Sequence, residues 1–324
     1  MRAAVFRATG PAPDVLSVEE LRPVPPGPGE VQVRVVLSGV NPTDWKERSR
    51  GGTLGDLPFK VPNQDGAGTI AAVGEGVDPG RVGERVWLYF AAWERQYGTA
   101  AELCTLPAEQ AVALPDGVSF ELGASLGIPA LTAHRCLLAD GPIEGRTVLV
   151  AGGAGAVGHY AIELARWLGA RLVIATVSGE RKAELARAAG AHETVDYRSE
   201  DATARIRSLA PAGVDRIVEV ALHQNVDLDS AVAAPNAAVA AYTGGGTTSL
   251  DLGAIMERNV VVRSVLVYTM PVGAVRDAVA DVSQALRDGA LTEMPAHRFP
   301  LARIAAAHDA VEGGAVGKVL VDLL

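Results

Sequence analysis

The chain has very little cysteine, with Cys104 and Cys136 as the only two among its 324 residues. Two cysteines exclude a disulfide scaffold and a cysteine-rich structural zinc site, because both need more sulfur atoms than the chain provides. So few thiols are typical of a protein from a reducing compartment.

The chain also lacks an excess of positive charge, since its formal net charge is −9 and its isoelectric point is about 5.2. A nucleic-acid-binding protein is expected to carry a basic face, because phosphate contacts need lysine and arginine. The composition therefore argues against nucleic acid as a partner.

Long apolar runs are missing as well. The longest apolar stretch, residues 147–162, is interrupted by glycines and ends near charged residues. It falls short of the roughly 20 consecutive apolar residues that span a bilayer. The first residues, MRAAVFRATG, lack the apolar core of a signal peptide. We therefore expect a cytoplasmic protein with no membrane partner.

The composition is that of a folded protein, with 48% apolar and 21% charged residues. At roughly 150 residues per domain, the length suggests two domains. Up to about residue 120 the chain reads as short strands separated by turns, with alternating or apolar segments at 31–36, 69–73 and 85–89. This part predicts a β-rich domain.

The pattern changes near residue 120. A helical region at 120–138 is followed by the apolar strand 147–151, a helix that ends at Gly169, and further alternating strands and helices. Such alternation is typical of a doubly wound parallel sheet. After residue 263 the elements are mixed again, with a helix at 272–286 and a terminal strand at 318–324. We predict an α/β domain, 122–263, inserted in a β-rich domain formed by 1–121 and 264–324.

A glycine-rich loop follows the first strand of the α/β domain. Gly153, Gly155 and Gly158 match G-x-G-x-x-G, and Ala156 and Val157 lie between the last two. After a strand and before a helix, this pattern predicts that the helix N-terminus binds a pyrophosphate. The alternative is an ordinary strand-to-helix turn built from small residues.

The next strand ends where an NAD site usually carries an acidic residue for the ribose hydroxyls. Ser178 stands near that place and can bond a 2′-phosphate, whereas a carboxylate would repel it. Arg181 and Lys182 follow and could neutralise the phosphate. We therefore favour NADPH as cofactor. The alternative is that Glu180 serves the ribose of NAD and that 180–187 is a solvated helix face.

Several motifs along the chain occur in the order found in one superfamily. They are SGVNPTD at 38–44, PNQDGAG at 62–68, GIPALTA at 127–133, the loop at 151–158, GAHETVDY at 190–197 and GKV at 317–319. With these motifs the chain resembles the zinc-independent quinone oxidoreductase branch of the medium-chain dehydrogenase/reductase superfamily, which includes ζ-crystallin. The resemblance implies a GroES-like fold for the β-rich domain, a Rossmann fold for the inserted domain, and a homodimer.

The resemblance also bears on the metal. Asn41 stands where the zinc enzymes of that superfamily have their first cysteine ligand. Gln64 and Asp65 stand where they have a His-Glu pair, and Ile128 lies in the region of the later ligand. The six histidines show no ligand spacing. We expect no zinc.

Without a metal, some carbonyl substrates are easier to reduce by hydride transfer than others. Reduction of a simple ketone localises negative charge on oxygen, which usually needs a metal or a strong acid. Hydride addition to a quinone or an α,β-unsaturated carbonyl spreads the charge into a phenolate or enolate. We therefore expect hydride transfer from NADPH to such a substrate. Two alternatives remain: an enoyl-thioester reductase of lipid or polyketide metabolism, and a non-catalytic NADPH-binding or RNA-binding protein of the crystallin kind.

The substrate site implied by the resemblance centres on Asn41, whose amide can donate to the substrate carbonyl, with Asp44 orienting Asn41 or a water. The same segment also looks like a helix start with a capping asparagine. Trp45 could stack on a flat ring or be part of the core. Lys46 could bond an oxygen of substrate or cofactor, or be solvated. Tyr268 could contact substrate as well as cofactor.

The remaining cofactor contacts are also carried over from the family. Thr132 is expected beside the nicotinamide, and Tyr197 beside the adenine and 2′-phosphate. The others are Tyr242, Gly244 and Gly245 after a buried strand, Leu266, Val267 and Tyr268 at the carboxamide, and Lys318 in the terminal Gly-Lys motif. Each has an ordinary structural alternative, such as a helix-interior threonine, a half-buried tyrosine or a surface lysine.

Overall fold

The structure is a computed structural model that describes residues 1–51 and 54–323. Internal contacts divide the chain into two compact units, which we call unit 1, Met1–Ile128 with Glu293–Leu324, and unit 2, Pro129–Thr292. Leu324, the last residue of the predicted terminal strand, lies outside the described residues. No helix in the described part of the chain is long and apolar enough to cross a membrane.

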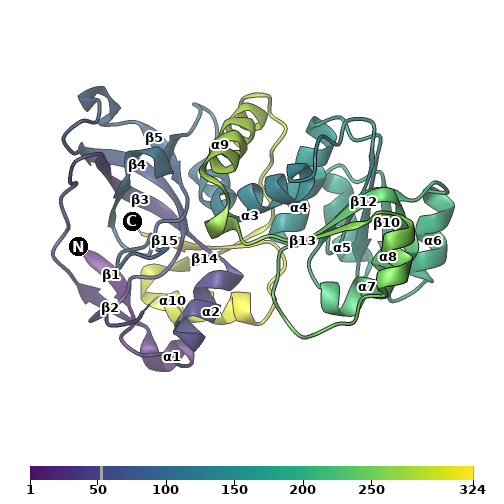
Figure 1. The fold of residues 1–324 in the computed structure, drawn as a ribbon. Helices are drawn as coiled ribbons and strands as arrows, with labels where there is room; N and C mark the ends of the chain where they lie inside the picture. The colour runs from purple at the N-terminus through teal and green to yellow at the C-terminus, as the bar shows by residue number, and fades with distance from the viewer. Residues whose placement is uncertain (52–53, 324) are drawn as a thin grey trace. The chain divides into compact units, whose positions relative to one another are not determined.

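Unit 1 contains a seven-stranded sheet with the order β14-β15-β3-β4-β5-β7, and β6 pairs with β3 (Figure 1). A separate antiparallel pair is formed by β1 and β2. The strands of unit 1 are β1 (Arg2–Val5), β2 (Ser17–Glu20), β3 (Glu30–Val40), β4 (Asp65–Val73), β5 (Arg85–Leu88), β6 (Leu103–Pro107), β7 (Ala111–Ala113), β14 (Ala296–Pro300) and β15 (Lys318–Asp322). Its helices are α1 (Ala12–Val15), α2 (Pro42–Arg50) and α10 (Ile304–Glu312), and α3 (Phe120–Leu138) continues into unit 2.

The long strand β3 contains the strand expected at 31–36 and continues to the residue before Asn41. Val31, Val33 and Val35 are fully buried in the core of unit 1, while the residues between them are partly or fully exposed. This alternation is the period of a strand with one buried face. Beyond the expected end at residue 36 the strand runs on to Val40, and α2 starts two residues later. The residue between them is Asn41.

Unit 2 contains a six-stranded parallel sheet with the order β10-β9-β8-β11-β12-β13. Its strands are β8 (Thr147–Val150), β9 (Leu172–Val177), β10 (Glu193–Asp196), β11 (Val214–Glu219), β12 (Ala233–Ala241) and β13 (Val261–Ser264). The strand order reverses on either side of β8, which confirms the predicted doubly wound sheet. Ligands bind such sheets outside the carboxyl ends of the strands, at the reversal.

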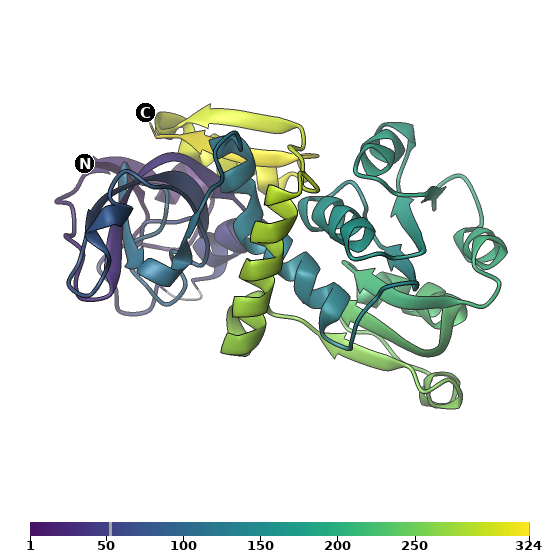
Figure 2. The same cartoon turned by 90° about the horizontal axis from the view of Figure 1, so that it is seen from above.

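The helices of unit 2 connect these strands. Figure 2 shows helices on both sides of the sheet, as right-handed crossovers require. They are α4 (Ala156–Trp167), α5 (Glu180–Ala188), α6 (Ala202–Leu209), α7 (Leu222–Val232), α8 (Leu252–Glu257) and α9 (Val272–Arg287). Gly169 and Gly190 follow α4 and α5 with φ of +80° and +99°, so both helices end at a left-handed glycine.

The second boundary between the units differs from the expected one. It lies at Glu293, whereas the sequence pattern placed it at 264. The reason is that α9 belongs with unit 2. Asp281 of α9 pairs with His134 of α3 at 2.8 Å, and Asp288 accepts a 2.9 Å hydrogen bond from the indole of Trp167 on α4.

Candidate active site

The glycine loop between β8 and α4 has the geometry that a pyrophosphate needs. A Cβ atom on Gly153 would lie 2.7 Å from Cβ of Ala175, and one on Gly158 would lie 2.3 Å from the carbonyl oxygen of Gly152. Both positions therefore require glycine for close packing. At Gly155 the nearest atom is 3.4 Å away, so the backbone there is open on one side.

The helix α4 begins directly after this loop, with Gly155 at its N-cap and Ala156, Val157 and Gly158 in its first turn. The first N–H groups of a helix have no partner within the helix and carry a partial positive charge. The loop itself is fixed to the end of β9, because Gly153 donates to the carbonyl of Thr176 at 3.0 Å. The residues present thus fit a dinucleotide, whose pyrophosphate these N–H groups would bind.

Polar side chains gather at the carboxyl ends of β9 and β10. Lys182 donates from Nζ to Oγ of Ser178 at 2.8 Å. Tyr197 follows β10, donates its backbone N–H to the carbonyl of Val177 at 3.2 Å, and has a side chain that is 51% exposed. Arg181 is exposed on the first turn of α5. The structure thus brings the predicted phosphate residues to one edge of the sheet.

The acidic residue that could replace them faces elsewhere. Glu180, which a site for NAD would use at the ribose, forms an ion pair with Arg187 of the same helix, α5. Its side chain is 73% exposed. The carboxylate is therefore occupied by a helix-surface pair.

A cavity of about 400 Å³ lies at the carboxyl ends of β12 and β13. Four of the residues that we expect at the cofactor line it together: Tyr242, Gly244, Gly245 and Leu266. Val267 and Tyr268 follow in a 3₁₀ turn and are not among the residues that line the cavity. Burial raises the pKa of the Tyr242 phenol, so this side chain stays neutral.

His223 is one of several residues that line this cavity without having been predicted from the sequence. His223, at the start of α7, lines it and packs against Gly246, where a Cβ atom would lie 3.0 Å from Cδ2 of the imidazole. Gly246 has a φ of +68°, so the chain turns tightly beneath the ring. No spacing in the sequence links the two residues.

Thr132 lies in the interior of α3, where its side chain is 5% exposed.

Three of the predicted residues of unit 1 meet in a buried network. Asn41 donates from Nδ2 to Oδ2 of Asp65 at 2.7 Å and accepts from Nζ of Lys318 at 2.8 Å. Lys318 also donates to Oδ2 of Asp65 at 3.3 Å. Asp44 accepts the backbone N–H of Asn41 at 2.6 Å, which is one half of a capping box. These four side chains are at most 2% exposed.

The structure gives two of these residues defined partners. Lys318, predicted at the cofactor with a surface lysine as the alternative, is buried, and its ammonium group is bound to Asn41 and Asp65 because β15 pairs with β3 in a register that sets Val319 opposite Val40. Asp44, predicted to orient Asn41 or a water, accepts from the backbone of Asn41, while Asp65 and Lys318 hold the amide.

The charge state of the network follows from its contacts. Burial, reinforced by the negative charge of Asp65, raises the pKa of Asp44 well above its usual range. Burial also raises the pKa of Asp65, while Lys318, Asn41 and the N–H of Ile128 act against that rise. We therefore place the proton on Asp44 and the negative charge on Asp65, beside the ammonium of Lys318.

The two other predicted substrate residues lie on α2. Trp45 and Lys46 are both half-buried, and Nζ of Lys46 lies 5.8 Å from the centroid of the Trp45 ring. This is the range of a cation–π contact. The Lys46 ammonium group therefore contacts the Trp45 ring, and neither side chain is fully exposed to solvent.

Two carboxyl groups of unit 2 are buried against each other. Glu219 ends β11, Asp229 lies on α7, and the two are 0% and 2% exposed. Glu219 accepts hydrogen bonds from the N–H of Ala221 and, at 3.0 Å, from Nδ2 of Asn225. Burial and the negative charge of the neighbouring Glu219 raise the pKa of Asp229 to about 8, and burial raises the pKa of Glu219 as well. We therefore expect Asp229 to be protonated at neutral pH.

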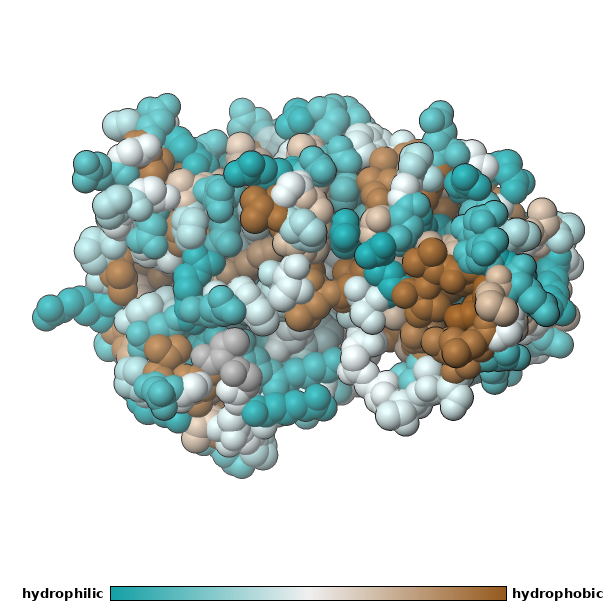
Figure 3. Space-filling view, viewed as in Figure 1, coloured by the Kyte–Doolittle hydropathy of each residue, from teal (hydrophilic) through white to brown (hydrophobic). Residues whose placement is uncertain are grey.

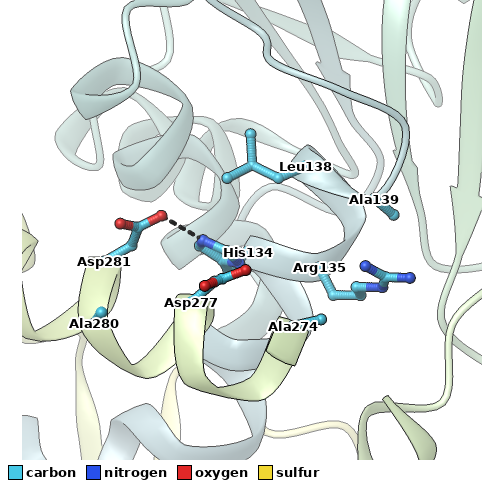
Figure 4. Close-up of a pocket in the computed structure, with 8 residues that line it drawn as sticks. All are labelled: His134, Arg135, Leu138, Ala139, Ala274, Asp277, Ala280 and Asp281. Atoms are coloured by element: carbon cyan, nitrogen blue, oxygen red, sulfur yellow. Dashed lines mark hydrogen bonds and ion pairs between the residues drawn. The ribbon is translucent and has the colours of Figure 1, made fainter. Parts of the chain in front are cut away.

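Figure 4 shows a second cavity of unit 2, about 350 Å³ in volume, between α3 and α9. His134 and Arg135 of α3 line it together with Asp277 and Asp281 of α9, and the dashed line marks the pair of His134 with Asp281. The sequence-predicted site residues are not among those that line it. Its ion pair holds α9 on α3.

Two family descriptions match the chain. Residues 27–116 match the alcohol dehydrogenase GroES-like domain, and residues 156–286 match the zinc-binding dehydrogenase family. The first match falls within unit 1 and the second within unit 2. The second name describes the whole family. It does not by itself assign zinc ligands to this chain.

Curated relatives and solved structures give the branch. A quinone oxidoreductase from Pseudomonas aeruginosa is 38% identical over 205 residues, which are 63% of this chain and 61% of the relative. The human quinone oxidoreductase is 28% identical over 99% of this chain and 97% of its own. A mycobacterial protein solved in complex with NADPH has a TM-score of 0.84 and 30% identity over 99% of both chains. The chain therefore belongs to the medium-chain dehydrogenase/reductase superfamily of NAD(P)-dependent oxidoreductases, in its quinone oxidoreductase branch.

Proposed function

We propose that the protein is an NADPH-dependent reductase that transfers hydride to a quinone or another α,β-unsaturated carbonyl without zinc. The observation that carries the proposal is the group of Ser178, Lys182 and Tyr197 at the carboxyl ends of β9 and β10. A hydroxyl and an ammonium bind a 2′-phosphate, and the carboxylate that would select NAD is paired with Arg187 at the helix surface.

The residues that would hold the cofactor come from three places in unit 2. The first turn of α4 offers N–H groups to the pyrophosphate, and the end of β9 offers Ser178 and Lys182 to the 2′-phosphate. The cavity at Tyr242, Gly244, Gly245 and Leu266 is the place for the nicotinamide, and Thr132 is proposed beside it. Bound NADPH supplies the hydride.

The donor set of unit 1 supports a reaction without zinc. Asn41 and Gln64 present amides where zinc enzymes of the superfamily carry a thiolate and an imidazole. The described residues contain no group of three or more His, Cys, Asp or Glu side chains placed to hold a metal ion. In addition, Lys318 places a positive charge between Asn41 and Asp65, which is unfavourable for a bound cation.

A quinone or enone suits this donor set. Hydride adds to one end of the conjugated system, and the electron pair moves onto the carbonyl oxygen as a phenolate or enolate. The Asn41 amide has one N–H left to donate to that oxygen, since the other is bound to Asp65. A proton from water completes the hydroquinone or the saturated carbonyl.

The proposal includes a homodimer formed along β13. This strand is an edge of the parallel sheet, so its outer backbone groups are unpaired in a single chain. Exposed apolar side chains lie on it and on α8 nearby, with Val261 at 43%, Leu252 at 70% and Met256 at 73% exposure. Figure 3 shows apolar side chains gathered over this part of unit 2.

Two measurements on the purified protein test the proposal. Titration with NADPH and NADH should give a dissociation constant at least about tenfold lower for NADPH, as expected for one charge-assisted phosphate contact. Prolonged treatment with a zinc chelator should leave quinone turnover unchanged. Equal affinity for both cofactors would overturn the phosphate site, and loss of activity that zinc restores would overturn the metal-free reaction.

A further inference from the structure

The Asn41 amide is bound at both ends by groups of opposite charge. Lys318 donates to its oxygen at 2.8 Å, and its nitrogen donates to Asp65 at 2.7 Å. An ammonium has only donors and a carboxylate has only acceptors, so the amide can take one orientation alone. The two charged groups therefore fix the Asn41 amide with Oδ1 toward Lys318 and Nδ2 toward Asp65.

Each charged group is held in turn by the fold of unit 1. Oδ1 of Asp65 accepts the N–H of Ile128 at 2.8 Å, and a Cβ atom on Gly127 would lie 2.2 Å from that oxygen. A Cβ atom on Gly39 would lie 3.0 Å from Cε of Lys318. Two glycines thus let the backbone close around the pair.

These contacts also change the amide electronically. A cation at the oxygen and an anion at one N–H both favour the resonance form with negative oxygen and positive nitrogen. In a buried site such hydrogen bonds strengthen one another. The N–H of Asn41 that remains is therefore a stronger donor than that of an ordinary asparagine.

We propose that Lys318 and Asp65 are positioning residues that orient and polarise the Asn41 amide, so that its remaining N–H meets the negative charge that develops on the substrate oxygen. This inference rests on the proposed function, in which Asn41 is the donor. The charges of Lys318 and Asp65 balance each other. Asp44 is neutral, because burial and the nearby Asp65 and Glu47 raise its pKa while Lys318 opposes the rise.

The kinetic test compares Lys318→Met with Lys60→Met. Lys60 is also a fully buried lysine of unit 1 in an ion pair, but its carboxylate partner is Glu47, whereas that of Lys318 is Asp65. Lys318→Met should lower kcat for a quinone about tenfold or more, at the lower end of what loss of an oxyanion donor costs. The KM for NADPH should change less than twofold. Lys60→Met should lower thermal stability and leave kcat within about twofold.

Asp65→Asn and the double variant add a second criterion. If the two charges act through one amide, kcat of the double variant should be no lower than kcat of the less active single variant, because effects of residues that act as a unit are not additive. Losses of kcat that multiply in the double variant would overturn the inference. A rise of the KM for NADPH in Lys318→Met, with kcat unchanged, would assign Lys318 to the cofactor and overturn it as well.

A measurement on the unaltered protein stays informative if the variants fold poorly. With ¹⁵N-labelled asparagine, one Nδ2 hydrogen of Asn41 should be shifted downfield and exchange slowly with solvent, in contrast to the exposed Asn236. Fast exchange of both hydrogens would overturn the network. Absence of quinone and enone turnover would overturn the proposed function instead, and this amide signal would still test the network.

Discussion

Nζ of Lys182 lies 2.8 Å from Oγ of Ser178, which joins the first turn of α5 to the end of β9. The two groups form the edge of the site where the proposed function places the 2′-phosphate. Tyr197, attached through its backbone to Val177, lies at the same edge. In the proposed function, the choice between NADPH and NADH depends on these few side chains.

Replacement of Lys182 by alanine should weaken NADPH binding by about 10- to 100-fold, which corresponds to loss of one charge-assisted hydrogen bond. NADH has no 2′-phosphate, so its dissociation constant should change less than twofold. Fluorescence titration of both cofactors measures the ratio. Arg187→Ala is the control, because that guanidinium is already paired with Glu180. An equal loss for both cofactors would place Lys182 outside the phosphate site.

The glycine loop predicts opposite results for two similar substitutions. Gly158→Ala puts a methyl group 2.3 Å from the oxygen of Gly152, so the loop must shift, at a cost of about 1–3 kcal/mol in the free energy of unfolding. Gly155→Ala meets nothing closer than 3.4 Å and should leave thermal stability nearly unchanged. It should still weaken both cofactors, because its methyl group stands on the open side of the loop. Thermal denaturation and cofactor titration separate the two effects.

The pair of Glu219 and Asp229 makes the stability depend on pH. The pKa of Asp229 is raised from 3.8 in the unfolded chain to about 8 in the fold. Between these values the folded protein binds up to one more proton, so the free energy of unfolding falls by up to about 1.4 kcal/mol per pH unit as pH rises. Stability from this group is complete below pH 4 and is lost by pH 8.

Asp229→Asn removes that titration and keeps the size of the side chain. It should raise the melting temperature by several degrees at pH 8.5 relative to the unaltered protein, and by much less at pH 5. The exposed Asp227→Asn on the same helix is the control. If both variants show the same pH dependence as the parent protein, the pKa of Asp229 is not raised in the fold.

The proposed dimer depends on the edge strand β13. Val261→Lys places a charge on the exposed side of this strand, and Met256→Lys does the same on α8. Each should shift the protein from dimer to monomer in analytical ultracentrifugation at micromolar concentration. Val82→Lys, at a 52% exposed apolar residue of unit 1, should not. A parent protein that sediments as a monomer would contradict the dimer directly.

Local patterns predicted the parts of the fold whose signals are contained in short segments. The helix α3 has the expected bounds, Phe120–Leu138, and the strand–glycine loop–helix unit at β8 and α4 lies where the motif placed it. Left-handed glycines end two helices as expected. These features depend on periodicity and on single residues with special backbone angles, both of which are visible in a sequence.

Features that depend on long-range packing were not visible. The partners of Lys318 follow from the register of β15 on β3, which joins residues far apart in the chain. The carboxyl pair needs α7 to fold back on β11, and the proximity of His223 to Gly246 needs a turn after β12. The boundary at Glu293 likewise depends on α9 packing against α3 and α4.

The most direct test of the proposed function is an assay of NADPH oxidation, measured as loss of NADPH absorbance. The acceptors are 9,10-phenanthrenequinone, 1,4-benzoquinone, a 2-enal and crotonyl-CoA. NADH as donor and NADP⁺ with a simple alcohol serve as controls. We expect turnover of a quinone or the enal, faster with NADPH than with NADH. Faster oxidation of the alcohol, preference for crotonyl-CoA, or no turnover of any acceptor despite tight NADPH binding would contradict the proposed function.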